Sequence, residues 1–266
     1  MMNASPRNRP EPQRRIILLG ASNLTRGVST IVEIARQTWG EPLDVMAALG
    51  HGRSYGLRSS VLYRTLPGIV HCNLWNDLRT RPPLPTAALI TDVGNDLIYE
   101  QPVEAVVPWV ETCLDRLEQV DAAAVMTLLP VEVLPSVQPW QFLTFRTIAF
   151  PTSRITFEEI TARALQLNLE LRRIAAERNL PVIEHDAQWY GLDPIHIKLR
   201  FWPAAWSRVL STWSPERESP DPPRGSLPRW LYLRSLLPDQ RWVLGLSQRR
   251  DQPVGGLRDG TLISYY

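Results

Sequence analysis

The sequence predicts an α/β fold in which a five-stranded parallel sheet lies between helices on both faces. Short apolar runs alternate along the chain with segments of helical periodicity. The runs are continuously apolar, as in strands buried on both faces, and they do not alternate with polar residues. Each run ends in glycine or small polar residues. Parallel neighbours need a connecting helix, so this order indicates a sheet covered by helices on both faces.

The elements follow in a regular order. The first strand is expected at 15–20 and is followed by a helix that starts near Leu24 and stops at Gly40 and Pro42. The remaining predicted strands share a short apolar run, and they are residues 44–49, 87–91, 122–129 and 181–184. The remaining predicted helices share an apolar stripe at helical spacing, and they are residues 73–79, 102–117, 156–174 and 202–213.

Three ranges divide the chain. Residues 1–13 are polar and predict a disordered leader. Residues 14–213 hold the α/β domain, in which 130–155 is expected to be a long irregular stretch. Residues 214–266 begin with a proline-rich linker and continue with short apolar pieces such as Trp230–Leu233 and Trp242–Leu244. They predict a C-terminal appendage of hairpins or a lid.

Composition excludes several classes of protein. The formal charge is +2 and no long run of like charge occurs, which disfavours a nucleic-acid partner. The two cysteines, Cys72 and Cys113, have no metal-binding spacing and favour reduced thiols. No segment has the length of a membrane span or a signal-peptide core, so we predict a cytoplasmic protein with no transmembrane segment. The oligomeric state stays open.

Polar and titratable residues gather where the predicted strands end. These are Ser22-Asn23, the loop from Gly50 to Ser54, Asp92–Asp96, and His185-Asp186 followed by Asp193–His196. Ligands of open parallel sheets bind at this edge. The set contains what acyl transfer needs: Ser22 as nucleophile, His196 as its base, and Asp193 to orient the imidazole. The N–H groups of Ser22 and Gly52 and the amide of Asn95 would stabilise the oxyanion.

Four segments in this order resemble the SGNH (GDSL-type) hydrolase family. They are ILLGASN around Ser22, ALGHGRS around Gly52, VGND around Asn95 and DPIH around His196. The resemblance implies a flavodoxin-like, three-layer αβα fold and hydrolysis of an ester or acyl group through a serine acyl-enzyme, with no metal or organic cofactor. It also implies the same roles for Ser22, Gly52, Asn95, Asp193 and His196.

Two positions depart from the family pattern. Ala21 stands where the family usually has an aspartate that is thought to brace the nucleophile turn, and Val93 stands where it usually has glycine. Several alternatives therefore stay open. Ser22 and Asn95 could be capping residues, and His185, Asp186, Asp193 and His196 could ligate a metal. The chain could also be a degenerate relative that binds a ligand or partner without turnover. A nucleotide-binding loop is disfavoured because no glycine-rich phosphate motif is present.

Substrate identity is not encoded in these motifs. The predicted partner is a small-molecule or acylated substrate, with hydrolase and acyltransferase both open. His51, inside the second loop, is a candidate substrate contact.

Overall fold

The computed structural model describes residues 10–61, 63–191, 193–214 and 225–266. Its main sheet has seven strands in the order β10-β11-β2-β1-β5-β6-β7. All neighbours are parallel except the pair of β10 and β11. The strands are β1 (Arg14–Leu19), β2 (Leu43–Ala48), β5 (Thr86–Ile90), β6 (Ala123–Thr127), β7 (Val182–Ile183), β10 (Gly255–Gly256) and β11 (Leu262–Tyr265).

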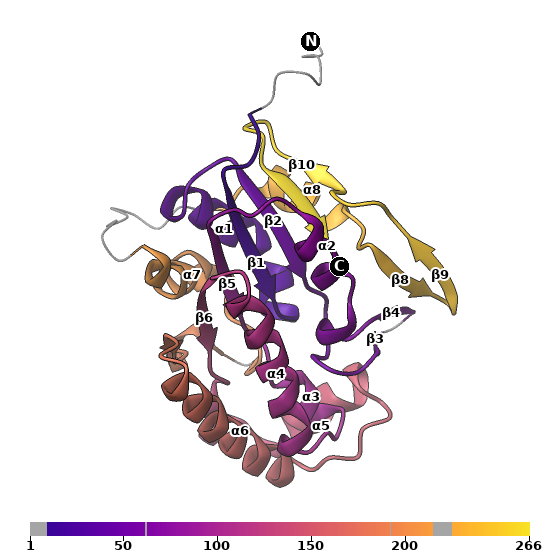
Figure 1. Cartoon of the computed structure of the whole chain (residues 1–266). Coiled ribbons are helices and arrows are strands. Elements are labelled where there is room, and N and C mark those ends of the chain that lie inside the picture. Colours follow the sequence, from indigo (N-terminus) through magenta and orange to yellow (C-terminus); the bar gives the residue numbers. More distant parts are fainter. Residues whose placement is uncertain (1–9, 62, 192, 215–224) are drawn as a thin grey trace.

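Helices cover both faces of this sheet (Figure 1). Side chains of β1 divide between two cores: Ile16 and Leu18 belong to one and Ile17 and Leu19 to the other, as the alternation of a strand requires. On the first face lie α1 (Ser22–Thr38), α7 (Trp202–Leu210) and α8 (Leu227–Ser235). On the second lie α2 (Leu74–Thr80), α4 (Val103–Glu118) and α6 (Phe157–Glu177). The predicted αβα architecture is confirmed, and the five predicted strands are all in the sheet.

The C-terminal segment extends the main sheet. β11 pairs in parallel with β2 from Leu262 opposite Asp44 to Tyr265 opposite Ala47. The appendage also forms part of a second, antiparallel sheet of four strands, ordered β3-β4-β8-β9. In it, β3 (Ser59–Val61) and β4 (Arg64–Leu66) pair with the hairpin of β8 (Gln240–Val243) and β9 (Leu246–Arg249). The last residues of the chain therefore pack beside the segment that follows β2.

Two local expectations are corrected. The stretch 130–155 is not irregular throughout, because it contains α5 (Pro139–Ala149). Pro139 occupies the first turn and Gln138 and Gln141 form a reciprocal capping box, which together favour a helix start. Trp230–Leu233 lies in α8 and not in a hairpin, with Ser226 as N-cap. By contrast, the capping box predicted from Thr156 and Glu159 is confirmed at the start of α6.

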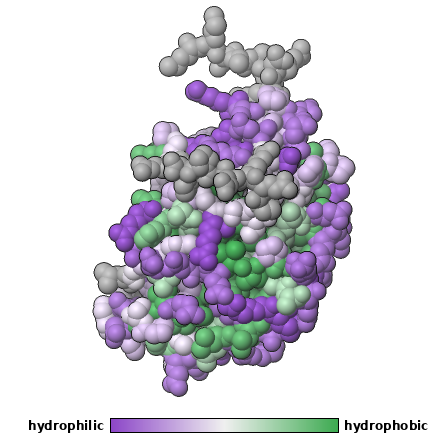
Figure 2. All heavy atoms as spheres, turned by 90° about the vertical axis from the view of Figure 1, so that its left-hand side faces the viewer, coloured by the Kyte–Doolittle hydropathy of each residue, from purple (hydrophilic) through white to green (hydrophobic). Residues whose placement is uncertain are grey.

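The remaining helices are short. They are α3 (Asn95–Ile98) and the 3-10 turns Ile69–His71, Val131–Ser136, Ala187–Trp189, Leu199–Phe201 and Ser211–Trp213. Within the described ranges, no helix combines the length and the apolar character that crossing a membrane requires. On the face turned to the viewer in Figure 2, hydrophobic side chains interrupt the hydrophilic surface in separate patches. Residues 1–9 of the expected leader lie outside the described residues, as does most of the proline-rich linker.

Candidate active site

Ser22 begins α1 directly after β1, at the edge where the parallel strands end. Because β2 and β5 flank β1 and run parallel to it, the loops that carry Gly52 and Asn95 reach the same edge. Ser22 is 8% exposed and lines a largely apolar cavity. The sequence placed Ser22 at a strand-to-helix turn, and the structure has it there.

The turn around Ser22 is held by Asp92, which follows β5. One Asp92 carboxylate oxygen accepts hydrogen bonds from the N–H groups of Ala21 (2.9 Å), Asn23 (3.0 Å) and Leu24 (3.2 Å). The other accepts one from the Asn23 side-chain amide at 2.9 Å. A carboxylate at the N-terminus of α1 also suits the positive end of the helix dipole. Asp92 thus supplies, from the neighbouring strand, the carboxylate that Ala21 lacks.

Asn23 joins the turn around Ser22 to the loop that carries His196. Its amide nitrogen donates to the main-chain oxygen of Ile195 and its oxygen accepts from the N–H of Ile197, both at 2.9 Å. These two bonds bracket His196 on both sides in the chain. The loops that follow β1 and β7 are therefore in direct contact, although they lie more than 170 residues apart in sequence.

His196 and Asp193 interact as the DxxH spacing predicts. The His196 Nδ1 atom lies 2.7 Å from Asp193 Oδ2, and Asp193 Oδ1 accepts from the N–H groups of Ile195 and His196. Burial alone would raise the pKa of Asp193, but the hydrogen bonds from His196 and these two N–H groups lower it overall. Asp193 is therefore ionised at neutral pH, and because it contacts Nδ1, it leaves the Nε2 atom of His196 available for another partner.

The hydrogen bond from Ser22 to His196 that a triad requires is not formed here. Among the described residues, the Ser22 hydroxyl has no hydrogen-bond partner. Catalytic hydrogen bonds of this kind are often long without substrate and tighten in the complex. The roles of Ser22, His196 and Asp193 in catalysis therefore stay a prediction.

The three predicted oxyanion donors are placed differently. The N–H groups of Ser22 and Gly52 have no acceptor within the described part of the chain. By contrast, the N–H groups of Ala21 and Asn23, on either side of Ser22, both donate to Asp92. Gly52 has φ +63°, and a Cβ there would come within 2.4 Å of Val61. Its main-chain oxygen accepts from the Tyr99 hydroxyl at 2.7 Å. The Asn95 amide donates one hydrogen to the Arg53 main-chain oxygen at 3.2 Å.

Asp96 holds the loop that follows Gly52. It is fully buried, accepts from the N–H of Tyr55 at 2.9 Å, and contacts the Ser54 hydroxyl. The Ser54 oxygen in turn accepts from the N–H groups of Gly56 and Leu57. Burial raises the pKa of Asp96 to about 6, although the bonds from Ser54 and Tyr55 lower it. The sequence does not predict this network, because the partners of Asp96 lie about 40 residues away in the chain.

The raised pKa of Asp96 predicts a pH-dependent stability. The folded protein holds this proton to about pH 6, whereas an unfolded aspartate releases it near pH ~4. The contribution of this group to stability is thus complete below pH ~4 and is lost as the pH rises to about 6, by on the order of 3 kcal/mol. We expect the free energy of unfolding of the wild type, minus that of Asp96→Asn, to fall over this range. A difference that is flat between pH 4 and 7 would contradict the assignment.

A largely apolar cavity of about 170 Å³ opens beside Ser22 and Asn95. The apolar residues around it come from the segments after β5 and β6 and from α5 and α6, and they include Leu97, Leu129, Val137, Phe142, Phe150 and Ala164. Val93, the second departure from the family pattern, also lines it. The residue with left-handed backbone in this loop is Asp92, with φ 59°. Position 93 therefore does not need the conformational freedom of a glycine.

The other titratable residues of the loops have distinct surroundings. His185 is buried and its Nδ1 contacts the Tyr190 hydroxyl. No cluster of three or more His, Cys, Asp or Glu side chains that could hold a metal exists among the residues placed by the structure. His51 is half-buried, and burial, followed by the charges of Arg234, Arg64, His196 and Arg26, lowers its pKa to about 4. His51 is thus neutral above pH ~5.

Comparisons with known proteins give matches in structure only. No family model matches the chain, and no curated protein matches it. The native aryl esterase of M. smegmatis is similar with a TM-score of 0.51 at 14% identity, over 75% of this chain and 97% of that one. The esterase EstA of Pseudoalteromonas sp. has a TM-score of 0.47 at 11% identity, over 75% and 97%. A lipolytic protein of the G-D-S-L family from Veillonella parvula has 0.45 at 16%, over 74% and 96%.

At sequence identities this low, a structural match supports a similarity of fold only. The match to the aryl esterase spans nearly all of that protein and most of this one. The resemblance expected from the four sequence segments is therefore confirmed as a resemblance of fold: this chain has the three-layer α/β fold of the SGNH (GDSL-type) hydrolases.

Proposed function

We propose that the protein is a serine esterase that hydrolyses small esters through Ser22, His196 and Asp193. The observation that carries this proposal is the Asn23 clamp, which ties the loop on both sides of His196 to the residue next to Ser22. A capping role for Ser22 would not need a histidine loop fixed beside it. The N–H groups of Ser22 and Gly52, which have no acceptor among the described residues, add support, since a tetrahedral intermediate requires such donors.

The proposed reaction has two halves. His196 Nε2 accepts the Ser22 proton as Oγ attacks the ester carbonyl carbon, and the resulting oxyanion accepts from the N–H groups of Ser22 and Gly52 and the Asn95 amide. The imidazolium, stabilised by Asp193, then protonates the leaving alcohol, so the C–O bond breaks and an acyl-enzyme remains. Water, deprotonated by His196, releases the acid and restores Ser22.

The substrate class follows from the cavity. An apolar space of about 170 Å³ would hold an uncharged acyl group, since an apolar protein cavity of ~150 Å³ holds benzene. Charged acyl groups would lose their hydration there without a partner. The name of the similar M. smegmatis protein, an aryl esterase, supports phenyl esters as the first test substrates.

Narrowing the cavity should change acyl preference. Ala164 is buried on α6 and lines the cavity, so Ala164→Leu adds three carbon atoms to it. We expect kcat/KM for phenyl hexanoate to fall about tenfold relative to phenyl acetate, in line with the discrimination that a few methylenes allow. The matched control is Ala176→Leu, which is exposed on the same helix. Equal changes for both esters in Ala164→Leu would mean that the acyl group does not occupy this cavity.

A fluorophosphonate probe tests the nucleophile. The wild type should be labelled covalently at one site, Ser22→Ala should not be labelled, and mass spectrometry should place the adduct on the peptide containing Ser22. Ser60→Ala, which removes an exposed serine of β3, should label as the wild type does. Labelling of Ser22→Ala equal to that of the wild type would remove Ser22 from the mechanism. An unlabelled wild type would favour the alternative of a relative that binds without turnover.

A cytoplasmic location is part of the proposal. Cys72 and Cys113 are free thiols and both are buried, as suits a reducing compartment.

A further inference from the structure

Arginines of three elements, β4, α8 and α1, act electrostatically on His51 in the Gly50–Gly52 loop. Arg64 of β4 lies against it: a Cβ built on Gly50 would be 3.5 Å from Arg64 Nη2. None of these arginines lines the apolar cavity, although Ser22 does. They therefore belong to a different part of the candidate active site from the proposed acyl pocket.

The second sheet adds another arginine to the same face. Arg64 pairs with Val243 of β8, and Arg241 lies two residues before Val243. Side chains two residues apart on a strand share a face, so Arg241 is a diagonal neighbour of Arg64. Burial, followed by the charge of Arg241, lowers the pKa of Arg64. Two like charges are thus kept together on a half-buried surface.

The other two arginines are Arg234 of α8 and Arg26 of α1, whose charges both act on His51. The Arg234 guanidinium lies 4.7 Å from the Trp230 ring centroid, and the Trp230 indole donates to the main-chain oxygen of Arg26 at 3.0 Å. Arg26 in turn lies 3.7 Å from Asp193, the orienting carboxylate of the triad. Arg26 therefore lies beside the residue that orients the proposed catalytic histidine, and the charges of Arg26, Arg64 and Arg234 all act on His51.

Among the described residues, three of these four arginines have no carboxylate partner, whereas Arg26 contacts Asp193. Arg64, Arg234 and Arg241 take part in none of the ion pairs between described residues. Arg36, Arg173 and Arg178 each contact two or more carboxylates. Concentrating unpaired guanidinium groups beside a reaction centre costs stability, unless an anion binds there.

We propose that Arg64 and Arg234 form an anion-binding subsite for the alcohol part of the substrate, so that the preferred esters carry a carboxylate or phosphate on the leaving group. This inference rests on the proposed esterase function. The acyl group would occupy the apolar cavity and the charged leaving group would face the arginines. Guanidinium groups suit this role because they bind carboxylate and phosphate oxygens through paired N–H donors.

The test compares leaving groups that differ in charge. The substrates are 4-acetoxybenzoate and 4-acetoxyphenyl phosphate, which are anionic, and 4-acetoxybenzamide, which is neutral. The measured quantity is the ratio of kcat/KM for each anionic ester to that for the neutral one. We expect this ratio to fall about tenfold in Arg64→Gln and further in the double variant with Arg234→Gln, the size typical of a charge-assisted hydrogen bond. Arg64→Lys should keep part of the preference.

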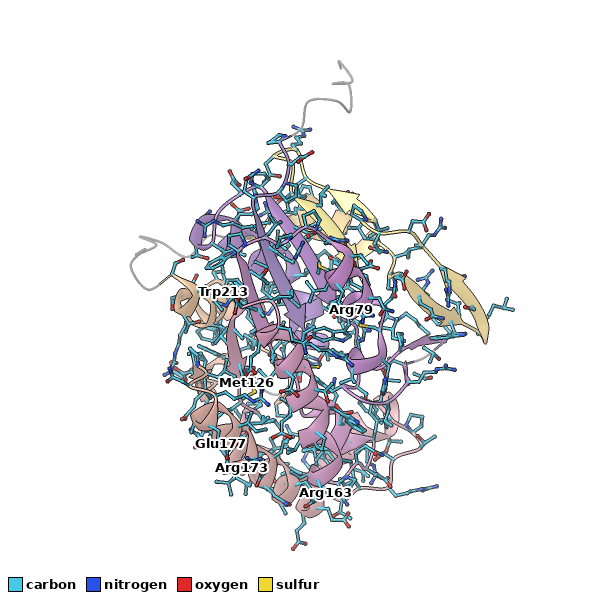
Figure 3. All side chains as sticks on the ribbon, viewed as in Figure 1. Arg79, Met126, Arg163, Arg173, Glu177 and Trp213 are labelled. Carbon is cyan, nitrogen blue, oxygen red and sulfur yellow. The ribbon has the colours of Figure 1, made fainter. Side chains whose placement is uncertain are left out.

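Arg79→Gln is the matched control. Arg79 is an exposed residue of α2 and is labelled in Figure 3. Its removal should leave the ratio of kcat/KM for anionic to neutral esters as in the wild type. A loss with either anion supports the subsite, and the carboxylate and phosphate arms show which anion it prefers. If the double variant has the same anionic-to-neutral kcat/KM ratios as the wild type, the proposed anion-binding subsite is wrong.

Binding separates this inference from the function on which it rests. Calorimetry with 4-hydroxybenzoate and phenyl phosphate on the Ser22→Ala variant needs no turnover. If the wild type hydrolyses no ester but these anions bind and Arg64→Gln abolishes binding, the esterase proposal fails and the subsite stands. If the neutral ester is hydrolysed and neither anion binds, the esterase proposal stands and the subsite fails.

Discussion

Ser22→Ala should lower kcat for phenyl acetate by about 10³-fold or more, because a triad without its nucleophile retains only binding and oxyanion stabilisation. The variant should fold as the wild type does. The Ser22 hydroxyl makes no hydrogen bond within the described residues, so its removal leaves no partner unsatisfied. We expect the free energy of unfolding to stay within about 0.5 kcal/mol, as for substitutions that break no contact. Steady-state kinetics and urea unfolding measure the two effects.

The double variant Ser22→Ala with His196→Ala strengthens this test. If the two side chains act in one step, the second substitution should cost almost nothing once the first is made. Ser60→Ala again serves as the control for loss of a serine hydroxyl. If the fold loss of kcat in the double variant equals the product of the fold losses in the two single variants, Ser22 and His196 do not act together.

Asp92→Ala should affect both stability and activity. The substitution leaves the N–H groups of Ala21, Asn23 and Leu24 without their acceptor, at a cost of about 3 kcal/mol or more. It also frees the Asn23 amide, which positions the His196 loop. We therefore expect kcat to fall about 100-fold, since small misplacements of catalytic groups carry losses of this size.

A matched control corrects for the backbone. Asp92 has φ 59°, so alanine at this position is strained in itself. Asp121 is exposed and has φ 49°, and Asp121→Ala measures that strain without the hydrogen bonds. If Asp92→Ala destabilises the protein no more than Asp121→Ala does, Asp92 does not hold the nucleophile turn.

The strands and the loops after them could be predicted because each depends on local sequence. A continuous apolar run such as Ile16–Leu19 is typical of a strand buried on both faces, and the residue after a parallel strand must lie at its end. The chain order of Ser22, Gly52, Asn95 and His196 then predicted one shared edge, and β1, β2 and β5 place the first three there.

The bracing residues could not be predicted because their roles arise only when distant loops meet. In sequence, Asp92 is one acid in a turn and Asn23 is a good helix-capping residue. The bonds from Asp92 to the Ser22 turn span about 70 residues, and those from Asn23 to the His196 loop span more than 170. The sequence did contain one signal for the role of Asp92. The turn around Ser22 has Ala21 in place of the aspartate expected from the resemblance, and Asp92 is an acid directly after a neighbouring strand.

The second sheet was missed for a related reason. Its strands β3 and β4 are three residues each, too short for a clear alternation of apolar and polar residues. Their partners β8 and β9 lie near the other end of the chain, and no local pattern indicates that pairing. The helix α5 was missed because its apolar residues are not confined to one face, as the exposed Trp140, Leu143 and Ile148 show.

The position of β11 has a consequence for attempts to shorten this protein. All six residues of β2 are buried, and β11 pairs with β2 along most of its length. Removing the C-terminal segment would leave an apolar strand with its N–H and C=O groups free on one side, a template for pairing with other molecules. A truncated chain would therefore be expected to self-associate and precipitate, even if every residue of the proposed triad were retained.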